Sequence, residues 1–290
     1  MGQLVYMNGN LVPVEDAKVS VYDHGFLYGD GAFEGIRVYG GRVFKLKEHI
    51  DRLYMSCRVL MIPLPDPAES MVQTVLDLVK TNDVGDGYVR ITVSRGVGLG
   101  LDPRVCKSAT IVIMTDKLAL YPPEMYKNGL EVVTVSTRVP PAQSIEPRVK
   151  SLGKYLCNIQ AKIEANRVGA GEGLMLNVEG YVAEATGDNI FLIKSGEIIT
   201  PPPYAGILAG ITRSTVIELA RSKGYNVRET MFTLFDVYTA DECFLTGTAA
   251  EVIPVVRVDA RIIGNGIPGQ VTLDLMCAFH DLTNGVGTSA

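Results

Sequence analysis

Histidine and cysteine do not form the patterns that often carry catalysis or bind metals in this chain. Its three histidines, His24, His49 and His280, are too few for a histidine-rich metal site and do not favour a Ser-His-Asp hydrolase. The five cysteines are odd in number and show neither a CxxC pair nor the spacing of a zinc site. They are typical of reduced, mostly buried thiols, and we predict no metal centre. We therefore expect any catalysis to use other groups.

Glycine motifs that bind nucleotides are also missing. Gly96, Gly98 and Gly100 form G-x-G-x-G rather than G-x-G-x-x-G, and Asp102-Pro103 interrupts any helix that could follow. This pattern favours a flexible loop. The sequence contains neither G-x-x-x-x-G-K-[ST] nor G-x-S-x-G, which excludes a P-loop and the nucleophile elbow of hydrolases.

The strongest signal in the sequence lies between residues 184 and 213, where three blocks of residues follow one another at fixed spacing. The blocks are Glu184-Ala-Thr-Gly-Asp-Asn189-Ile-Phe191, Ile198-Ile-Thr200 and Leu208-Ala-Gly210-Ile211-Thr212-Arg213. In order and in spacing they resemble the signature of the class IV aminotransferases. Enzymes of that class depend on pyridoxal 5'-phosphate (PLP).

Four further segments extend this resemblance over nearly the whole chain. Residues 28–37 resemble the family's Y-G-x-x-x-F-E-G-x-R, residues 49–53 resemble H-x-x-R-L, residues 150–156 resemble K-x-x-G-N-Y-L, and residues 246–251 resemble S/T-G-T-A-A-E. Within the class, this last segment and Tyr88-Val-Arg90 are most similar to branched-chain amino acid aminotransferases. The resemblance implies a mixed α and β (α+β) chain with the two-domain fold of D-amino acid aminotransferase, fold type IV of the PLP enzymes.

A transaminase of this kind needs one amine with two tasks. The amine holds PLP covalently and then moves a proton between the substrate α-carbon and the cofactor. The resemblance assigns both tasks to Lys150, two residues ahead of a helix that we expect to begin near Leu152. The competing lysines, Lys154 and Lys162, fall inside that helix, and we expect them to be solvated or structural. Lys154 also stands where asparagine is common in the family.

Two further residues are implied for the ring of the cofactor. Glu184 matches the carboxylate that keeps the pyridine nitrogen protonated, which makes the ring a better electron sink. The small residues Ala183, Ala185 and Gly187 around it suit a carboxylate packed against a cofactor. Tyr155 resembles the tyrosine that hydrogen-bonds the phenolic oxygen of PLP.

The phosphate of the cofactor needs fixed hydrogen-bond donors. A helix expected over 212–223 would supply the backbone N–H groups of Ile211 and Thr212 and the positive end of its dipole. The resemblance adds the hydroxyl of Thr248 and the guanidinium fork of Arg52.

Substrate recognition has to accept both an apolar side chain and the carboxylate of glutamate in one pocket. Apolar walls are expected from Tyr28, Phe33, Leu101 and Tyr155. Arg90, assisted by Tyr88, would meet the side-chain carboxylate of glutamate, while the turn 248–250 would bind the α-carboxylate. The substrate-binding residues predicted in this way are Tyr28, Phe33, Arg37, Tyr88, Arg90, Leu101, Thr248, Ala249 and Ala250.

The predicted reaction is PLP-dependent transamination of branched-chain L-amino acids (leucine, isoleucine, valine) with 2-oxoglutarate. The alternatives from the same class are a D-amino acid or (R)-amine transaminase and an aminodeoxychorismate lyase. The segment Ser94-Arg95-Gly96 resembles the corresponding segment of the lyase group. D-amino acid enzymes follow this turn with an arginine and a histidine, whereas Val97–Leu101 holds neither. A PLP-carrying protein without catalysis is the alternative from a different class.

The resemblance also implies a homodimer. In the family, Tyr28 and the loop Gly98–Asp102 enter the pocket of the neighbouring subunit. A dimer would then be the minimal functional unit.

Hydrophobic periodicity and turn residues predict how the chain is organised. We expect a smaller α+β domain over 1–115, a linker over 116–129 and a larger PLP-binding domain over 130–290. Pro122-Pro123 in the linker argues against a helix or a central strand there. Strands are expected over 4–8, 10–14, 33–39, 42–45, 88–94, 109–115, 130–138, 173–178, 190–194, 241–246 and 253–258, and helices over 46–60, 67–80, 152–169 and 212–223.

Composition limits the remaining possibilities. The 290 residues are 47% hydrophobic and 20% charged, which excludes intrinsic disorder. The net charge of −5 and the lack of long basic runs predict no nucleic-acid partner. No apolar stretch is long enough to span a membrane and no signal peptide is recognisable, so we expect a cytoplasmic protein.

Overall fold

The computed structural model describes residues 2–117, 121–285 and 287–289 of the chain. Contacts between residues divide the chain into two compact units. The first contains Met1–Leu118, Val149–Gly153 and Thr283–Ala290, and the second contains Ala119–Arg148 and Lys154–Leu282. The expected linker over 116–129 falls partly on 118–120, outside the described residues. Among the helices that are described, none is long and apolar enough to cross a membrane.

The first unit is built on a sheet with the strand order β16-β4-β3-β5-β6-β1-β2. Its long central pair, β3 and β5, is antiparallel, and β6 continues the antiparallel pairing on the far side of β5. Turns with positive φ join neighbouring strands at Asn8-Gly9 and Gly40-Gly41, as the sequence predicts. The strands are β1 Leu4–Met7, β2 Asn10–Pro13, β3 Gly31–Tyr39, β4 Arg42–Val43, β5 Gly87–Ser94, β6 Thr110–Asp116 and β16 Thr288–Ser289.

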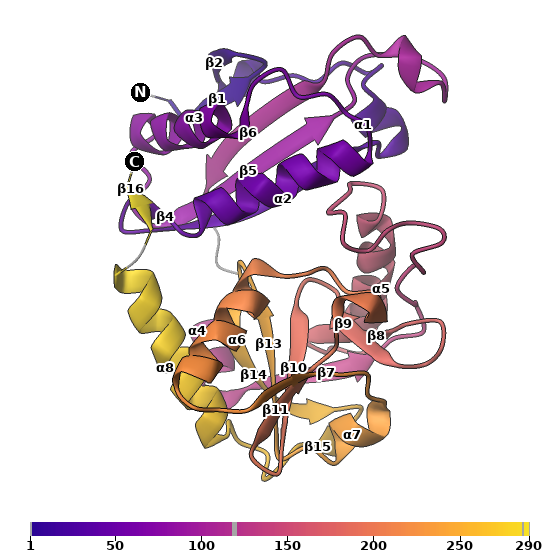
Figure 1. Cartoon of the computed structure of the whole chain (residues 1–290), viewed down its shortest axis with the longest axis vertical. Coiled ribbons are helices and arrows are strands. Elements are labelled where there is room, and N and C mark those ends of the chain that lie inside the picture. The colour runs from indigo at the N-terminus through magenta and orange to yellow at the C-terminus, as the bar shows by residue number, and fades with distance from the viewer. Residues whose placement is uncertain (1, 118–120, 286, 290) are drawn as a thin grey trace. The chain divides into compact units, whose positions relative to one another are not determined.

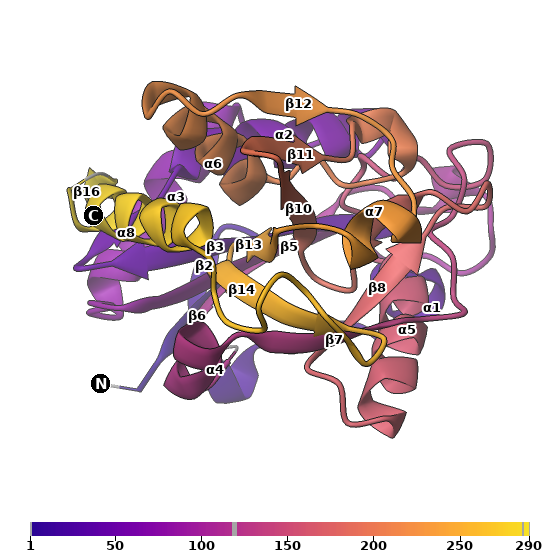
Figure 2. The same cartoon turned by 90° about the horizontal axis from the view of Figure 1, so that it is seen from below.

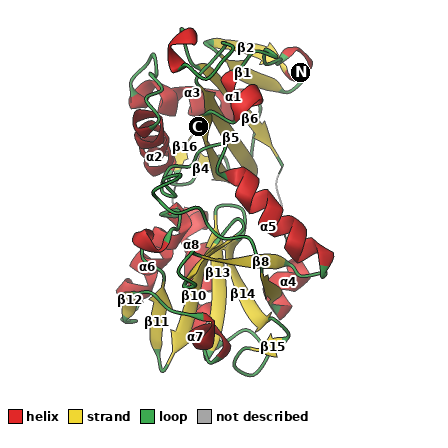
Figure 3. Cartoon of the chain, turned by 90° about the vertical axis from the view of Figure 1, so that its right-hand side faces the viewer, coloured by secondary structure: helices red, strands yellow, loops and turns green. Residues whose placement is uncertain are grey.

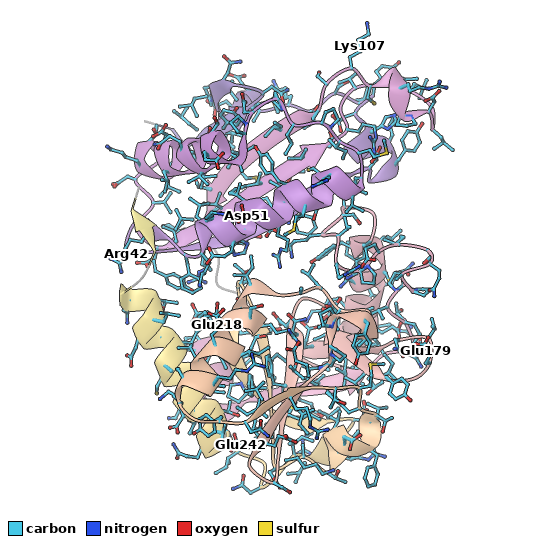
Figure 4. The ribbon with its side chains drawn as sticks, in the orientation of Figure 1. Arg42, Asp51, Lys107, Glu179, Glu218 and Glu242 are labelled. Carbon is cyan, nitrogen blue, oxygen red and sulfur yellow. The ribbon has the colours of Figure 1, made fainter. Side chains whose placement is uncertain are left out.

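Helices α2 (Leu46–Val59) and α3 (Ala68–Thr81) cover one face of this sheet (Figure 1). Apolar residues three and four apart give each helix a buried stripe, and these stripes pack on the apolar side chains of the strands. Asp51, labelled in Figure 4, lies on the exposed side of α2 and accepts a hydrogen bond from the Lys47 amine. A short helix, α1 (His24–Tyr28), precedes β3.

In the second unit, the pairing of β9 with β10 closes the strand order β10-β13-β14-β7-β8-β9 into a ring. Strands β11 and β12 extend the sheet beyond β10 (Figure 3). The inside of the ring is filled by apolar side chains, among them Leu174, Ile190 and Ile253. The strands are β7 Leu130–Thr134, β8 Glu172–Leu176, β9 Val182–Ala185, β10 Asn189–Lys194, β11 Glu197–Thr200, β12 Val227–Glu229, β13 Glu242–Gly247, β14 Glu251–Val258 and β15 Arg261–Ile262.

Helices line the outside of these strands, and α4 lies beside β14 (Figure 2). The helices are α4 Pro123–Asn128, α5 Tyr155–Arg167, α6 Ile211–Ser222, α7 Leu234–Tyr238 and α8 Gln270–Gly285. The expectation that Pro122-Pro123 excludes a helix is wrong, because α4 begins at Pro123. Proline is tolerated at the first helical position, where its missing N–H has no partner to lose.

Helix α5 differs from its prediction in two ways. It begins at Tyr155 rather than near Leu152, because Leu152 N–H is bonded to Gly31 in the first unit. Its buried residues are Asn158, Ala161 and Ala165. The larger apolar residues that trace its helical face, Leu156, Ile159 and Ile163, are 54–63% exposed.

Candidate active site

Lys150 lies on the short segment Val149–Gly153, which runs beside the start of β3 in the first unit. The Phe33 N–H donates to the Lys150 carbonyl oxygen at 3.0 Å, and the Leu152 N–H donates to the Gly31 carbonyl oxygen at 2.9 Å. The Lys150 amine lies 4.9 Å from the centre of the Phe33 ring. The backbone is thus fixed on both sides of a half-buried lysine, which suits an amine that has to meet a reactant in one position.

The Arg52 guanidinium is bonded to the carboxylate of Glu34. Its Nε and Nη2 lie 2.7 and 2.8 Å from the two Glu34 carboxylate oxygens, and His49 Nδ1 lies 2.8 Å from one of them. Burial by itself raises the pKa of Glu34, but Arg52 and His49 hold that pKa well below its ordinary value. Burial lowers the pKa of His49, so its imidazole is neutral at pH 7 and donates from Nδ1. A buried carboxylate therefore orients the arginine.

Four predicted substrate residues come together on the paired strands β3 and β5, namely Phe33, Arg37, Tyr88 and Arg90. Gly35 lies opposite Arg90, and Arg37 lies opposite Tyr88. The Arg90 guanidinium carbon is 3.6 Å from the centre of the Phe33 ring, a cation–π contact. A Cβ on Gly35 would stand 1.8 Å from the Tyr88 hydroxyl, so the absence of a side chain there makes room for the tyrosine. An aromatic wall and a cation thus share one face.

Tyr28 and Leu101 lie on exposed segments of the first unit. Tyr28 ends α1, and its hydroxyl accepts the Gly100 N–H at 3.1 Å, which ties the loop to the helix. Leu101 is 83% exposed. Within a single chain Leu101 therefore forms no apolar wall with the described residues, and its predicted role requires a second copy.

Glu184 lies on β9 in the second unit and is 5% exposed. Its Oε1 accepts a hydrogen bond from the Lys154 amine at 2.9 Å, and its Oε2 accepts one from the Leu208 N–H at 2.8 Å. The Lys154 side chain is 2% exposed, so the expectation of a solvated lysine is wrong. Burial lowers the pKa of Lys154, but Glu184 raises it by more, so the pKa lies above its ordinary value.

The beginning of α6 has the features of an anion site. Gly210 is the N-cap, and none of the described side chains caps the helix. A Cβ on Gly210 would stand 2.1 Å from Asn189 Oδ1, so Asn189 packs directly against the N-cap backbone. The same amide donates to the Leu208 carbonyl oxygen at 3.0 Å. This leaves the N–H groups of Ile211 and Thr212 at the positive end of the helix dipole, where an anion binds favourably.

Thr248, Ala249 and Ala250 form the turn that joins β13 to β14. The turn follows Gly247, where a Cβ would stand 1.8 Å from Asp188 Oδ1, so the carboxylate packs closely on the glycine. Thr248 and Ala249 are half-buried. A tight turn with accessible backbone suits the binding of a small anionic group.

The predicted site residues form two groups, one in each unit. The first-unit group is Tyr28, Phe33, Arg37, Arg52, Tyr88, Arg90, Leu101 and Lys150, and the second-unit group is Tyr155, Glu184, Ile211, Thr212, Thr248, Ala249 and Ala250. Tyr155 is the first residue of α5 and is half-buried. In the described ranges, no cluster of His, Cys, Asp and Glu side chains is arranged to hold a metal ion.

Comparison with known proteins identifies the family. Residues 31–258 match the model of the amino-transferase class IV family. The chain is a class IV aminotransferase. It is 50% identical to a putative branched-chain-amino-acid aminotransferase of Methanocaldococcus jannaschii, over 96% of each chain.

Two solved aminotransferase structures share the fold of this class IV aminotransferase. The branched-chain amino acid aminotransferase of Escherichia coli has a TM-score of 0.95 at 34% identity, with 98% of this chain and 96% of that chain covered. The branched-chain aminotransferase of the thermophilic archaeon Thermoproteus uzoniensis, solved with norvaline, has a TM-score of 0.93 at 34% identity, with 98% and 96% covered.

A third structure shows a relative with a cofactor derivative. It is a branched-chain amino acid aminotransferase complexed with N-(5'-phosphopyridoxyl)-L-glutamate, with a TM-score of 0.93 at 37% identity and 98% and 95% of the two chains covered. The predicted mixed α and β fold of type IV, the aminotransferase class and the cofactor PLP are confirmed by these relatives.

The residues of this aminotransferase fit the cofactor of its class. The uncapped start of α6 can take a phosphate, because its backbone donors have no side-chain acceptor among the described residues. The buried carboxylate of Glu184 can accept a bond from a protonated ring nitrogen, since each of its oxygens can accept a further hydrogen bond beside the one that holds it. Lys150 supplies an amine on a backbone that β3 holds in place.

Sequence reasoning missed three residues that hold this machinery together. Glu34 and His49 lie within the family motifs, but nothing in their spacing shows that they orient Arg52. Lys154 could have been singled out from the sequence, because it stands where asparagine is common in the family. Its pairing with Glu184 depends on a contact across thirty residues of sequence, which no local pattern shows.

Proposed function

We propose that this chain transfers the amino group of L-leucine, L-isoleucine and L-valine to 2-oxoglutarate, with PLP as cofactor. The main support for this class of substrates is the contact between Arg90 and Phe33, because it places a cation and an apolar ring on one face of the paired strands β3 and β5. Two kinds of substrate side chain, one apolar and one anionic, can use such a face. The likeness to relatives named for branched-chain amino acids and a relative's complex with a glutamate derivative support the proposal.

PLP supplies an electron sink for the bond broken at the substrate α-carbon. Ile211 and Thr212 bind its phosphate through backbone N–H groups, with Thr248 and Arg52 as further donors. Glu34 holds the Arg52 guanidinium in one orientation, so this cation is already placed when the phosphate arrives. The Tyr155 hydroxyl bonds the phenolic oxygen.

The chain moves and holds two protons. The Lys150 amine would hold PLP covalently and, once free, would move the proton between the substrate α-carbon and the C4′ carbon of the cofactor. The Glu184 carboxylate keeps a proton on the pyridine nitrogen, because an ionised neighbour favours the charged form of the ring. These two assignments follow the family resemblance, and the fixed backbone of Lys150 and the bound oxygens of Glu184 support them.

Substrate is bound at two ends. The turn Thr248-Ala249-Ala250 binds the α-carboxylate that all substrates share. Phe33 packs on the branched apolar side chains, whereas Arg90, with Tyr88 beside it, binds the side-chain carboxylate of glutamate. Arg37, opposite Tyr88, belongs to the same strand pair.

A homodimer in the cytoplasm completes the proposal. Leu156, Ile159 and Ile163 expose one apolar face of α5, and Leu101 exposes an apolar side chain on its loop. Such surface is typical of an interface. The five cysteines are all free, as is usual in a reducing compartment.

A panel of amino donors tests the proposed function. The full chain with PLP is incubated with 2-oxoglutarate and L-leucine, L-isoleucine, L-valine, D-alanine or an (R)-amine, and glutamate formation is measured. We expect turnover with the three L-donors and little with the others. Faster reaction of D-alanine or the (R)-amine would favour the alternative within the class, and absence of turnover with every donor would favour a PLP-carrying protein without catalysis.

A further inference from the structure

One buried ion pair of the second unit joins Lys154, which the proposed function does not use, to the carboxylate of Glu184. Lys154 is the N-cap of α5, and its amine lies 2.9 Å from Glu184 Oε1 and 3.3 Å from the Pro147 carbonyl oxygen. The side chains of Lys154 and Glu184 are 2% and 6% exposed. A full positive charge is therefore held away from water beside the carboxylate assigned to the cofactor.

We propose that Lys154 is a positioning residue, the resident counter-ion that holds the Glu184 carboxylate in place before PLP binds. The inference rests on the proposed role of Glu184 toward the pyridine nitrogen. Lys154 fixes one carboxylate oxygen, and the Leu208 N–H fixes the other. Leu208 lies three residues before Ile211, so the carboxylate is also tied to the loop that leads to the phosphate-binding end of α6.

The charges explain why such a counter-ion matters most in the protein without cofactor. A buried carboxylate without a partner is strongly unfavourable. In the wild type, Lys154 supplies the partner whether or not PLP is present. Without Lys154, the carboxylate has a cationic partner only when the protonated ring nitrogen of PLP is bound. An asparagine at this position, as is common in the family, carries no charge and leaves that pairing to the cofactor.

A purely structural lysine predicts something different. If Lys154 only anchored the start of α5 through the Pro147 carbonyl, its loss would cost the same stability with and without PLP. If it is the counter-ion of Glu184, its loss costs more without PLP, and PLP stabilises the variant by more than it stabilises the wild type. The difference between the two states therefore distinguishes the roles.

The experiment measures thermal unfolding of the full chain for the wild type and for Lys154→Met. Each protein is measured with saturating PLP and after PLP is removed with hydroxylamine, which breaks its bond to the lysine, followed by dialysis. We expect the unfolding midpoint of the variant to fall by about 6 °C or more without PLP and by less than about half of that with PLP. Lys162→Met is the matched control on the same helix. Its amine donates to the Gly171 carbonyl oxygen, so its loss should lower both midpoints equally.

A second variant keeps the test decisive if Lys154→Met folds poorly. The double variant Lys154→Met with Glu184→Gln removes both charges. Without PLP, its unfolding midpoint should recover at least about half of the decrease that Lys154→Met alone causes. Equal losses with and without PLP, or a double variant no more stable than Lys154→Met, would overturn the inference while leaving the proposed function intact. If PLP does not raise the unfolding midpoint of the wild type, the proposed function is overturned, and this inference with it.

Discussion

The backbone at Lys150 is held by main-chain hydrogen bonds, which do not involve the lysine side chain. Phe33 and Gly31 hold the segment through main-chain hydrogen bonds. We expect Lys150→Ala to retain PLP but to transaminate at least about 100-fold more slowly, because the nucleophile and proton carrier is lost. Peptide mapping after borohydride reduction of the wild type locates the cofactor. Label on Lys154 or Lys162 would contradict the assignment.

Glu34 links stability to pH through its pairing with Arg52. The pKa of Glu34 is lower in the folded protein than in the unfolded chain, where it is near 4.5. The ionised carboxylate therefore stabilises the folded protein at pH values above 4.5, and this stabilisation is lost progressively as the pH falls below 4.5. Glu34→Gln removes the carboxylate that faces the buried Arg52 guanidinium and should cost about 3 kcal/mol at pH 7. Urea unfolding of variant and wild type from pH 7 to pH 3 measures the difference, which should shrink below pH 4.5. A constant difference would mean that Glu34 does not titrate as described.

Single residues could be predicted where a motif carries them, and not where a distant contact defines them. Lys150 and Glu184 were found through their motifs, together with the chemistry that the motifs imply. The burial of Lys154 could not be predicted, because a lysine near a helix start is usually solvated and only the fold brings Glu184 to it. The pairing of Arg52 with Glu34 was hidden for the same reason.

Elements with clear periodicity match their predictions closely. Alternating β-branched residues located β5 and β6, and apolar residues at helical spacing located α2 and α3 within one or two residues. The helix α8 had no prediction, since Val271, Leu273 and Leu275 alternate like a strand. Its start is instead fixed by Glu242, a residue of β13 labelled in Figure 4, whose carboxylate accepts the Thr272 N–H at 2.8 Å.

The N-terminus of α6 can be tested as an element. Gly210→Ala places a Cβ against Asn189 Oδ1 and forces the N-cap backbone or the amide to move. We expect PLP affinity to fall by about 1–3 kcal/mol, the range for overpacking at a tight contact. Gly85→Ala is the control, because no described atom lies within 4 Å of its Cβ position. PLP titration by absorbance measures both, and an unchanged Gly210→Ala would remove α6 from the phosphate site.

The proposed homodimer can be tested at the scale of the whole molecule. If the apolar face of α5 lies in a homodimer interface, Ile159→Glu should produce monomers and abolish most of the activity, because a charge would be buried there. Gln160→Glu, the next residue and exposed, should leave both unchanged. Light scattering after gel filtration measures the mass. Dimers of Ile159→Glu, or a monomeric wild type, would contradict this interface.

The central claim is that one face of the protein accepts both an apolar and an anionic substrate side chain. The most direct measurement is single-turnover reaction of the PLP form with L-leucine and with L-glutamate, followed by cofactor absorbance, in the wild type and in Arg90→Met. Methionine keeps length and the contact with Phe33 while removing the charge.

The account predicts that glutamate loses about 2–4 kcal/mol in kcat/KM, as expected for a charge-assisted pair left unmade, because only its side chain meets the guanidinium. Leucine should change by less than about 1 kcal/mol, because it never meets that charge. Equal losses on both donors would contradict the account, because Arg90 would then hold the shared α-carboxylate or the fold.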